Sequence, residues 1–505
     1  MTATQQQEPI LPTLVLYNSK SRSKEPLCPL EPNHIKMYTC GPTIYDSAHV
    51  GNFRAFLTYD VVKRVLLYFG YSVQHVCNLT DVDDKILARC KERGVDVQTL
   101  TKQYEQVFLQ DVAALNIIPA QHYPRATNHI QDMVDLVQGL VKNELAYQTT
   151  DGSWYFNTRN QPNYGTQLIQ LTVDEMEPQE RTDEASGKAH FQDFCLWKAY
   201  KEGLDRPDCS WDTPLGYGRP GWHLECSAMA RVFLGDTIDI HCGGIDLKFP
   251  HHENEIAQSE GFSGKTFCNC WIHNGFVNIG GEKMSKSTGN FLTLRDACPK
   301  PDDVRAYRYL VVSSHYRNPL SFTDQAMEAS KNALKRMDKV KTGLADTLAK
   351  AATGLAMEGD SDIATTVVPG ELKSFDTALL DDLSMPRAAA SFFALIKEAE
   401  NILKEANKGV AVDILGLQAI QDALDQMDQV LGIFYNVPLT ESQAKEGNES
   451  TAIPYEVLDL VGQRTAAKEA QDWDLADSLR GRITELGFTV KDVKGGGEPI
   501  ISRLS

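Results

Sequence analysis

The segment TCGPTIYDSAHVGNFR carries residues suited to binding a polyphosphate. A strand is expected to end near the start of this segment, and a turn and then a helix should follow. His49, Gly51 and Asn52 lie where that helix is expected to begin. Free backbone amides and the positive end of the helix dipole attract anions there, His49 can donate to a phosphate oxygen, and Gly51 lets a flat adenine approach the backbone. Taken alone, the pattern is more often a tight turn with a surface imidazole.

A second segment, GGEKMSKSTGN, places Lys283 and Lys286 on what must be an exposed, glycine-flanked loop. When an α-phosphate is attacked, negative charge moves onto the phosphoryl oxygens and the pyrophosphate. Two ammonium groups on a hinged loop can stabilise that transient charge. A solvated loop of lysine and serine is the alternative, but the whole KMSKS string after a strand is much rarer than two isolated lysines.

Possible metal ligands form a third group: Cys40, Cys226 and the segment FPHHENEIAQS. The proline suits the first turn of a helix, so His251 and Glu255 would project from one face, and the spacing also allows His252 with Glu255. Two thiolates, an imidazole and a carboxylate make a plausible tetrahedral zinc set. Sequence alone cannot bring Cys40 to Cys226, and buried free cysteines beside a helix-start histidine pair explain each residue singly.

The periodicity of apolar residues predicts the elements that must position these groups. HIKMYTCG and YSVQHVCNL read as strands, and the stretch between them repeats apolar residues at helical spacing from Val50 to Gly70. Strand, helix and strand in this order indicate a right-handed parallel crossover. Strand patterns resume at DTIDIHCGG and TFCNCWIHNGFVNIGG, which should complete the sheet. We therefore predict an α/β fold with a doubly wound parallel sheet.

Shifts in composition divide the chain into several parts. Aromatic, turn-rich sequence marks an insertion, helical patterns dominate after Pro301, and GLAMEGDSDIATTVVPG at 354–370 reads as an acidic linker. We expect two halves of a catalytic domain at 1–140 and 216–295, an insertion at 141–215, a helical region at 296–353, a helical bundle at 371–440 and a small C-terminal domain at 451–505.

Composition excludes several classes of protein. The chain has 505 residues, ample for a large core, and a net charge of −18, which argues against a generic nucleic-acid coat. Eleven scattered cysteines do not suggest a secreted disulfide framework. No apolar run is long enough for a membrane span, and the N-terminus lacks a signal-peptide pattern. We expect a cytoplasmic protein with no membrane association.

These segments, in this order, resemble the cysteinyl-tRNA synthetase family of class I aminoacyl-tRNA synthetases. The resemblance runs through MYTCGPTIYDSAHVGN, NLTDVDDKI, YPRATNHI, GRPGWHLECSAM, DIHCGGIDLKFPHHENEIAQS and EKMSKSTGN. It implies a Rossmann-like catalytic domain that activates L-cysteine with Mg-ATP and transfers it to the 3′ end of cysteine tRNA. HVGN corresponds to the HIGH signature, with Asn52 at the final position. We expect a monomer.

The resemblance also assigns roles to particular residues. It implies a zinc ion that binds the substrate thiolate, held by Cys40, Cys226, His251 and Glu255. His49, Gly51, Asn52, Asp246, Lys283 and Lys286 would bind ATP, and His49, Asn52 and the two lysines would assist catalysis. Gly41, Thr80 and Trp222 would line the cysteine pocket. Thr80 could instead cap a helix, Trp222 could be core and Asp246 could hold a turn.

Recognition of tRNA would fall to the C-terminal half. The resemblance implies that KEAQDWDLADSLRGRI reads the anticodon, with Trp473 stacking on a base, Asp477 accepting from a guanine edge and Lys468 meeting a base or phosphate. A helical hairpin with Trp473 as its packing anchor is an equal alternative. The helical region at 296–353 offers a basic cluster for phosphates: Lys331, Lys335, Arg336, Lys339 and Lys341.

Two other functions remain open at this point. A related ligase that passes cysteine to an amino sugar would share the activating core, but it would lack the anticodon module. A second alternative is a catalytically silent paralogue that binds nucleotide or RNA. Because the metal-ligand and KMSKS residues are intact, nothing in the sequence supports it.

Overall fold

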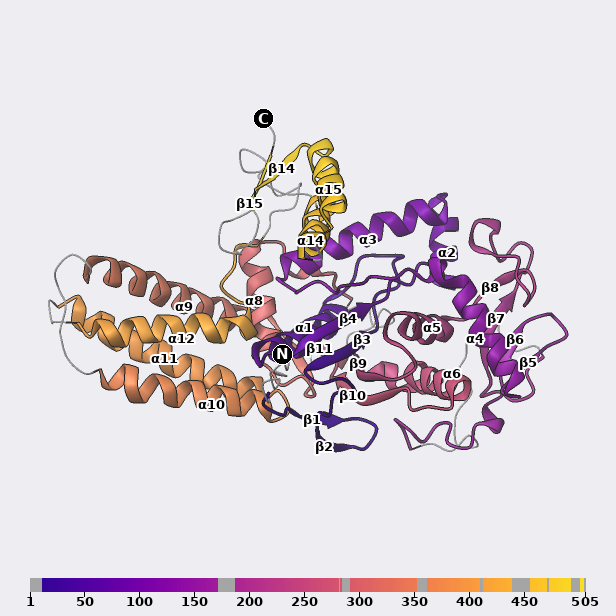
Figure 1. Cartoon of the computed structure of the whole chain (residues 1–505), viewed down its shortest axis with the longest axis horizontal. Coiled ribbons are helices and arrows are strands. Elements are labelled where there is room, and N and C mark those ends of the chain that lie inside the picture. Colours follow the sequence, from indigo (N-terminus) through magenta and orange to yellow (C-terminus); the bar gives the residue numbers. More distant parts are fainter. Residues whose placement is uncertain are drawn as a thin grey trace, which may run out of the picture.

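A computed structural model describes residues 11–170, 187–280, 282–283, 291–351, 361–408, 412–437, 455–469, 472–491 and 500–503. In Figure 1 the domain with the parallel sheet occupies the centre, an inserted sheet lies to the right, a helical bundle to the left and a small C-terminal unit above. In the part of the chain that the structure describes, no helix is long and apolar enough to cross a membrane.

The central sheet has four parallel strands in the order β10-β9-β3-β4. Its strands are β3 (His34–Thr39), β4 (Ser72–Cys77), β9 (Ile238–Gly244) and β10 (Cys268–Asn274). Almost every residue of β9 is buried, as expected for a parallel strand with both faces covered. The doubly wound parallel sheet predicted from the sequence is confirmed.

Helices cover both faces of this sheet and set the position of its switch point. Helix α1 (Val50–Tyr68) joins β3 to β4, and α6 (Glu253–Ser263) joins β9 to β10. Because these crossovers run outward in opposite directions from the central pair, the strand order reverses between β3 and β9. A ligand site is expected in the crevice at the carboxyl ends of those two strands.

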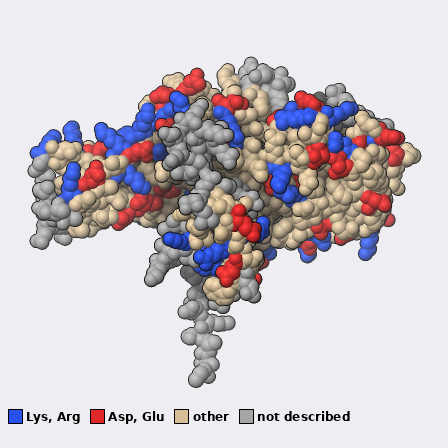
Figure 2. Space-filling model, turned by 90° about the horizontal axis from the view of Figure 1, so that it is seen from above, with Lys and Arg blue, Asp and Glu red and all other residues tan. Residues whose placement is uncertain are grey.

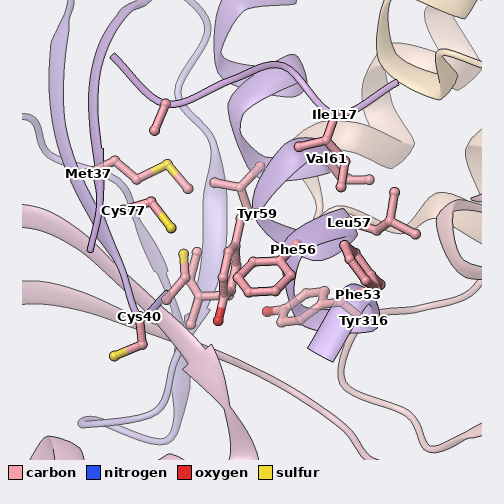
Figure 3. Close-up of a cluster of buried hydrophobic side chains, with 14 of the residues drawn as sticks. Met37, Cys40, Phe53, Phe56, Leu57, Tyr59, Val61, Cys77, Ile117 and Tyr316 are labelled. Atoms are coloured by element: carbon pink, nitrogen blue, oxygen red, sulfur yellow. The ribbon is translucent and has the colours of Figure 1, made fainter. Parts of the chain in front are cut away.

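Helix α1 is the most deeply buried connection. Figure 3 shows its side chains, among them Phe56 and Tyr59, facing Met37 and Cys77 of the neighbouring strands. The rings of Phe56 and Tyr59 meet edge-on, 5.8 Å apart. This packing fixes the N-terminus of α1 beside the end of β3.

The remaining elements of the N-terminal half surround that sheet. A hairpin of β1 (Val15–Asn18) and β2 (Ser23–Pro26) precedes it, and α2 (Asp84–Arg93), α3 (Val97–Ala114) and α4 (Ile130–Lys142) follow β4. The insertion forms an antiparallel sheet of β5 (Ala146–Gln148), β6 (Trp154–Phe156), β7 (Phe194–Ala199) and β8 (Gly218–Pro220), after which α5 (Trp222–Leu234) returns to the main sheet.

The C-terminal half is mainly helical. It contains β11 (Val277–Ile279), β12 (Glu282–Lys283), α7 (Leu294–Ala297), α8 (Pro301–Val312), β13 (Leu320–Phe322), α9 (Asp324–Ala351), α10 (Val368–Leu380), α11 (Met385–Ala406) and α12 (Ile414–Leu431). The C-terminal unit, with its own apolar core, has α14 (Tyr455–Glu469), α15 (Trp473–Glu485), β14 (Phe488–Lys491) and β15 (Ile500–Arg503).

One expectation for this half is wrong in part. The predicted acidic linker at 354–370 does not extend past 360, because a helical segment already begins at 362 and runs into α10. Ser361 starts that segment: its hydroxyl accepts from the amide of Ala364 and donates to Asp413. The stretch after Pro301 is mainly helical, as expected, although β13 pairs in parallel with β11.

A buried group of charges, which we call the joint, connects α1 to the helical bundle. Asp60 of α1 accepts from Arg64 and from Arg308 of α8, both at 2.8 Å. The two guanidinium groups in turn donate to carbonyls at the C-terminus of α12, Arg64 to Gln429 and Arg308 to Leu431. Cations suit the negative end of a helix dipole, so the end of the bundle is fixed directly against α1.

Candidate active site

The N-terminus of α1 opens into a cleft of about 280 Å³ lined by His49, Asn52, Lys85 and Phe291, among others. His49 is the residue that caps the helix. Its Nδ1 atom accepts from the amide of Asn52 at 3.1 Å, and its own amide donates to Oδ1 of Asn52 at 3.2 Å. Because Nδ1 is used as an acceptor, the neutral ring carries its proton on Nε2.

This reciprocal pair gives Asn52 a structural role that the sequence left open. It is a capping box in which histidine and asparagine replace the usual serine and glutamate. The ring of His49 also lies edge-on to Phe291, with centroids 4.9 Å apart. Gly51 lies in the first turn of the same helix, beside the cleft.

The described residues at the start of the KMSKS segment and beyond its end pair with neighbouring parts of the fold. Lys283 lies in β12 and pairs with Asn278 of β11, whereas Lys286 falls outside the described residues. After the segment, the amide of Val50 donates to the carbonyl of Leu292 at 3.1 Å. The chain that follows KMSKS is therefore bonded directly to the first turn of α1.

Four buried donor groups meet at the carboxyl end of β3. Cys40 follows β3, Cys226 comes from α5, and His251 and Glu255 come from the start of α6. One ligand atom from each lies within 4.8 Å of all the others. The Oε1 atom of Glu255 is 3.0 Å from Nε2 of His251 and 3.8 Å from Sγ of Cys40. The structure thus brings together all four residues that the resemblance implied.

Two members of this cluster are favoured as anions. Burial alone would raise the pKa of Glu255, but the imidazoles of His241 and His251 lower it to about 2. A hydrogen bond with Cys40 lowers the pKa of Cys226 to about 6, against the effect of burial. By contrast, burial and Cys226 raise the pKa of the Cys40 thiol, and Glu255 and Cys226 raise the pKa of His251 to about 10 against the effect of burial. Ligands of a tetrahedral ion with bonds of 2.0–2.3 Å stand about 3.3–3.8 Å apart. The donor set and its spacing therefore fit a metal ion such as zinc.

A second set of four donors overlaps the first. Cys40, His241, His252 and Glu255 also lie within 4.8 Å of one another. This set has a single thiol, and His252 already contacts His273 through its Nδ1 atom at 2.8 Å. The geometry therefore leaves both His251 and His252 close to a possible metal position. The set with Cys226 is favoured because it has two thiols in place of one.

A ring of histidines supports the donors from outside. His241 contacts the Oε2 atom of Glu255 at 2.8 Å, and His223 contacts Nδ1 of His251 at 2.9 Å. Such partners fix the orientation of metal ligands. No separate signal in the sequence pointed to His223 or His241, although they lie inside the motifs GWHLEC and DIHCGG.

The expected cysteine-pocket residues lie around this cluster. The ring of Trp222 stacks on His251, with centroids 4.3 Å apart, so Trp222 is part of the site and not remote core. Thr80 is buried, and its hydroxyl donates to Glu225; Asp83, not Thr80, caps α2. Gly41 lies so close to the next strand end that an added Cβ would stand 1.6 Å from the carbonyl oxygen of Asn78.

Asp246 follows β9, the strand next to β3. It lies in a single turn, Ile245–Leu247, directly after β9, and it is exposed. The carboxyl end of β9 lies beside that of β3, so this carboxylate faces the same edge of the sheet as the donor cluster.

One cavity adjoins the cluster on the side of the insertion and a second cavity adjoins the first, and no sequence pattern predicted either. The inner cavity, about 140 Å³, is bounded by Trp222 and His223, and the outer, about 260 Å³, lies between α2 and the inserted sheet. They share the wall formed by Asp84, Lys198 and Arg219. Lys198 contacts Asp84 at 2.7 Å, and Arg219 contacts both Asp84 and Asp205.

The outer cavity has an excess of cationic groups. Its lining includes Lys91, Lys198, Lys201 and Arg219 against Asp84 and Asp205. An apolar side chain, Leu204, is 68% exposed at its rim. An excess of cations suits the phosphates of a nucleic acid.

The C-terminal residues expected to contact the anticodon are exposed or half-buried. Trp473 is 59% exposed and Asp477 is exposed, so the alternative of a buried packing anchor is wrong. Lys468 is half-buried on α14.

The basic cluster on α9 is weaker than its sequence suggested. Three of its members are already paired with acids: Lys331 with Asp303, Arg336 with Glu400 and Lys341 with Asp425. Figure 2 shows basic and acidic side chains intermixed along this part of the molecule. Lys335 and Lys339 form no ion pair with the described residues, and they leave the cluster modestly positive.

Comparison with known families agrees with the fold and the site. Residues 26–332 match the family described as "tRNA synthetases class I (C) catalytic domain", and residues 374–435 match the DALR domain. A methionyl-tRNA synthetase of Mycobacterium tuberculosis, bound to methionyl-adenylate, superposes with a TM-score of 0.59 at 15% identity, covering 85% of this chain and 94% of that one. A leucyl-tRNA synthetase of Agrobacterium radiobacter gives 0.56 at 11% identity, covering 84% and 86%. Fold and site together define a class I aminoacyl-tRNA synthetase.

Curated relatives narrow the class. The cysteine–tRNA ligase of Chlamydia pneumoniae is 40% identical over 488 residues, covering 96% of this chain and 97% of that protein. The enzyme of the same name from Bacillus licheniformis is 39% identical over 484 residues, covering 96% and 98%. The chain belongs to the cysteine–tRNA ligase family.

Proposed function

We propose that this protein activates L-cysteine with ATP to cysteinyl adenylate and transfers the cysteinyl group to the 3′ end of cysteine tRNA. One observation carries the proposal beyond family membership. Two thiols, an imidazole and a carboxylate are buried together at the switch point of the sheet, next to a capped helix N-terminus that suits a polyphosphate.

In the first step, the groups around the cleft position ATP and stabilise the charge that develops on it. His49 would donate from Nε2 to a phosphate oxygen, Asn52 would keep that ring in place, and Gly51 would admit the adenine. Lys283 and Lys286 would meet the departing pyrophosphate. Asp246 would accept from the ribose hydroxyls. Catalysis then rests on positioning and electrostatics, with no covalent intermediate on the protein.

Cys40, Cys226, His251 and Glu255 would hold a zinc ion. When bound, zinc supplies a site that takes a thiolate much more readily than an alcohol, and so separates cysteine from serine. Gly41, Thr80 and Trp222 would form the walls that orient the rest of the amino acid. A hydrophobic pocket could not reject an isosteric hydroxyl so strongly, and a metal makes an editing site unnecessary.

For the second step, the acceptor end of the tRNA must reach the adenylate. We place it along the two cavities beside the insertion, where Lys91 and Lys201 would meet phosphates. Trp473, Asp477 and Lys468 would read the anticodon through stacking and hydrogen bonds. We further propose that the enzyme is a cytoplasmic monomer.

The test is charging by the purified, zinc-replete protein. We expect ATP–pyrophosphate exchange that depends on cysteine, and charging of a tRNA with a cysteine anticodon. Exchange without charging would favour transfer to another acceptor, such as an amino sugar. The absence of both reactions would contradict the proposal.

A further inference from the structure

Three buried side chains connect the two segments that carry the thiols. The amide of Gly41, the residue after Cys40, donates to Oδ1 of Asn78 at 2.8 Å. The Nδ2 group of Asn78 donates to the hydroxyl of Thr80 at 3.1 Å. That hydroxyl donates to Oε2 of Glu225, the residue before Cys226, at 2.8 Å.

The direction of the first two of these hydrogen bonds is fixed by the groups that make them. The Gly41 amide can only donate, so the carbonyl oxygen of the Asn78 side chain must face it and the amide nitrogen must face Thr80. Because the Thr80 oxygen accepts there, its single hydrogen remains for Glu225. Asn78, Thr80 and Glu225 are each at most 2% exposed, so water cannot readily substitute for a lost bond.

Two further observations indicate that this arrangement serves the site and not stability alone. The backbones of Gly41 and Asn78 approach so closely that any side chain at position 41 would collide with the Asn78 carbonyl. The Oε1 atom of Glu225 is buried with no hydrogen-bond partner among the described residues. A buried carboxyl group with a hydrogen-bond partner at only one of its oxygens lowers the stability of the fold. Groups of this kind are typical of functional sites.

We propose that Asn78, Thr80 and Glu225 form a brace that fixes the spacing between Cys40 and Cys226 and thereby sets the affinity for the metal. Cys40 follows β3 and Cys226 lies on α5, so the backbone hydrogen bonds within these two elements do not set the distance between the sulfurs. The brace crosses that gap through the end of β4. Asn78 and Glu225 act as positioning residues, because neither belongs to the set of candidate metal ligands. This inference rests on the metal site of the proposed function.

The experiment measures binding of Zn²⁺ to the full chain without substrates. The variants are Asn78→Ala, which removes the first two of the three bonds, and Thr80→Val, which removes the hydroxyl without changing the shape of the side chain. We expect either one to transfer Zn²⁺ to a chromophoric chelator about 10–100-fold more readily than wild type, the usual loss for a partner that orients metal ligands. Glu225→Gln can still accept from Thr80 and should stay within about threefold of wild type.

Thr39→Val is the matched control. The Thr39 hydroxyl makes a buried contact of 3.0 Å with His75, so it also links β3 to β4, one residue from Cys40, but it lies outside the brace. Thermal unfolding of each variant reports any general loss of stability. The brace is refuted if Asn78→Ala and Thr80→Val hold Zn²⁺ as tightly as wild type, or if Thr39→Val weakens it equally.

The outcomes separate this inference from the proposed function. Wild-type protein that binds no Zn²⁺ would overturn the metal site and the brace together. Wild-type protein that binds Zn²⁺ but does not activate cysteine would overturn the proposed function, and the comparison of variants would still decide on the brace.

Discussion

Replacing Asp60 by Asn should loosen the joint between the helix that carries His49 and the helical bundle. In the wild type, one oxygen of Asp60 accepts from both Arg64 and Arg308 at 2.8 Å, and the other accepts from the amide of Ile118 at 2.8 Å. Asparagine can still accept from the amide of Ile118. It turns an NH₂ group toward two buried guanidinium groups, which then lack a counter-ion.

The size of the effect follows from burial. The side chains of Asp60 and Arg308 are fully buried, and that of Arg64 is 8% exposed. Removing one partner of a buried ion pair lowers the free energy of unfolding by about 3–5 kcal/mol, whereas an exposed ion pair contributes less than about 1 kcal/mol. We therefore expect Asp60→Asn to lower the free energy of unfolding by about 3–5 kcal/mol, a large part of the usual 5–15 kcal/mol.

The same carboxyl predicts a pH dependence. Burial would raise the pKa of Asp60, but Arg64 and Arg308 lower it below its ordinary value of 3.8. A lowered pKa in the folded state means that this contribution is complete above pH 4 and is lost as the pH falls through the folded-state pKa. The difference between wild type and Asp60→Asn should be constant from pH 5 to 8 and shrink below pH 4.

Urea unfolding, followed by circular dichroism at pH 7 and at pH 3.5, measures both effects. Asp425→Asn is the control, because Asp425 pairs with Lys341 at 2.7 Å on the surface. Equal shifts for the two variants, or a loss under about 1 kcal/mol for Asp60→Asn, would show that the joint does not hold the bundle to α1.

Three further changes test the site and its surroundings. His49→Ala should lower kcat for ATP–pyrophosphate exchange about 100-fold or more, because the phosphate donor is lost, and a loss below fivefold would argue against its role. Lys201→Glu should raise KM for tRNA in charging about tenfold and leave exchange unchanged, whereas an equal effect on both reactions would remove the outer cavity from the tRNA path. Burial raises the pKa of Asp111 to about 6 although Arg295 opposes it, so ionisation of this carboxyl costs stability above that pH. Asp111→Asn should therefore gain on the order of 2 kcal/mol in urea unfolding at pH 8 and nothing at pH 3.5, and a loss at pH 8 would contradict that sign.

Local patterns predicted the elements that carry the site. The helix expected from Val50 to Gly70 is α1, and the strand expected in HIKMYTCG is β3, because periodicity reflects burial along a single element. The start of the helical segment at Ser361 was missed, although a serine three residues before the amide it caps is a readable signal. An acidic, glycine-containing composition outweighed that signal.

Long-range geometry could not be predicted in the same way. Nothing in the sequence brings Cys40 to Cys226 or separates His251 from His252, because their approach depends on how β3, α5 and α6 pack around one sheet edge. The role of Asn52 in the cap was local and could have been inferred, since asparagine three residues after a capping residue can bond back to it. The cavities beside the insertion depend on two segments that are distant in sequence.

The relative rate of activation of cysteine and serine tests the central claim most directly. The measurement is kcat/KM for ATP–pyrophosphate exchange with each amino acid, using wild-type protein loaded with zinc. If the buried Cys40, Cys226, His251 and Glu255 cluster selects the substrate through a metal–thiolate contact, cysteine should exceed serine by about 10⁴-fold or more. A ratio near the 10–200-fold typical of a merely hydrophobic pocket would contradict the account.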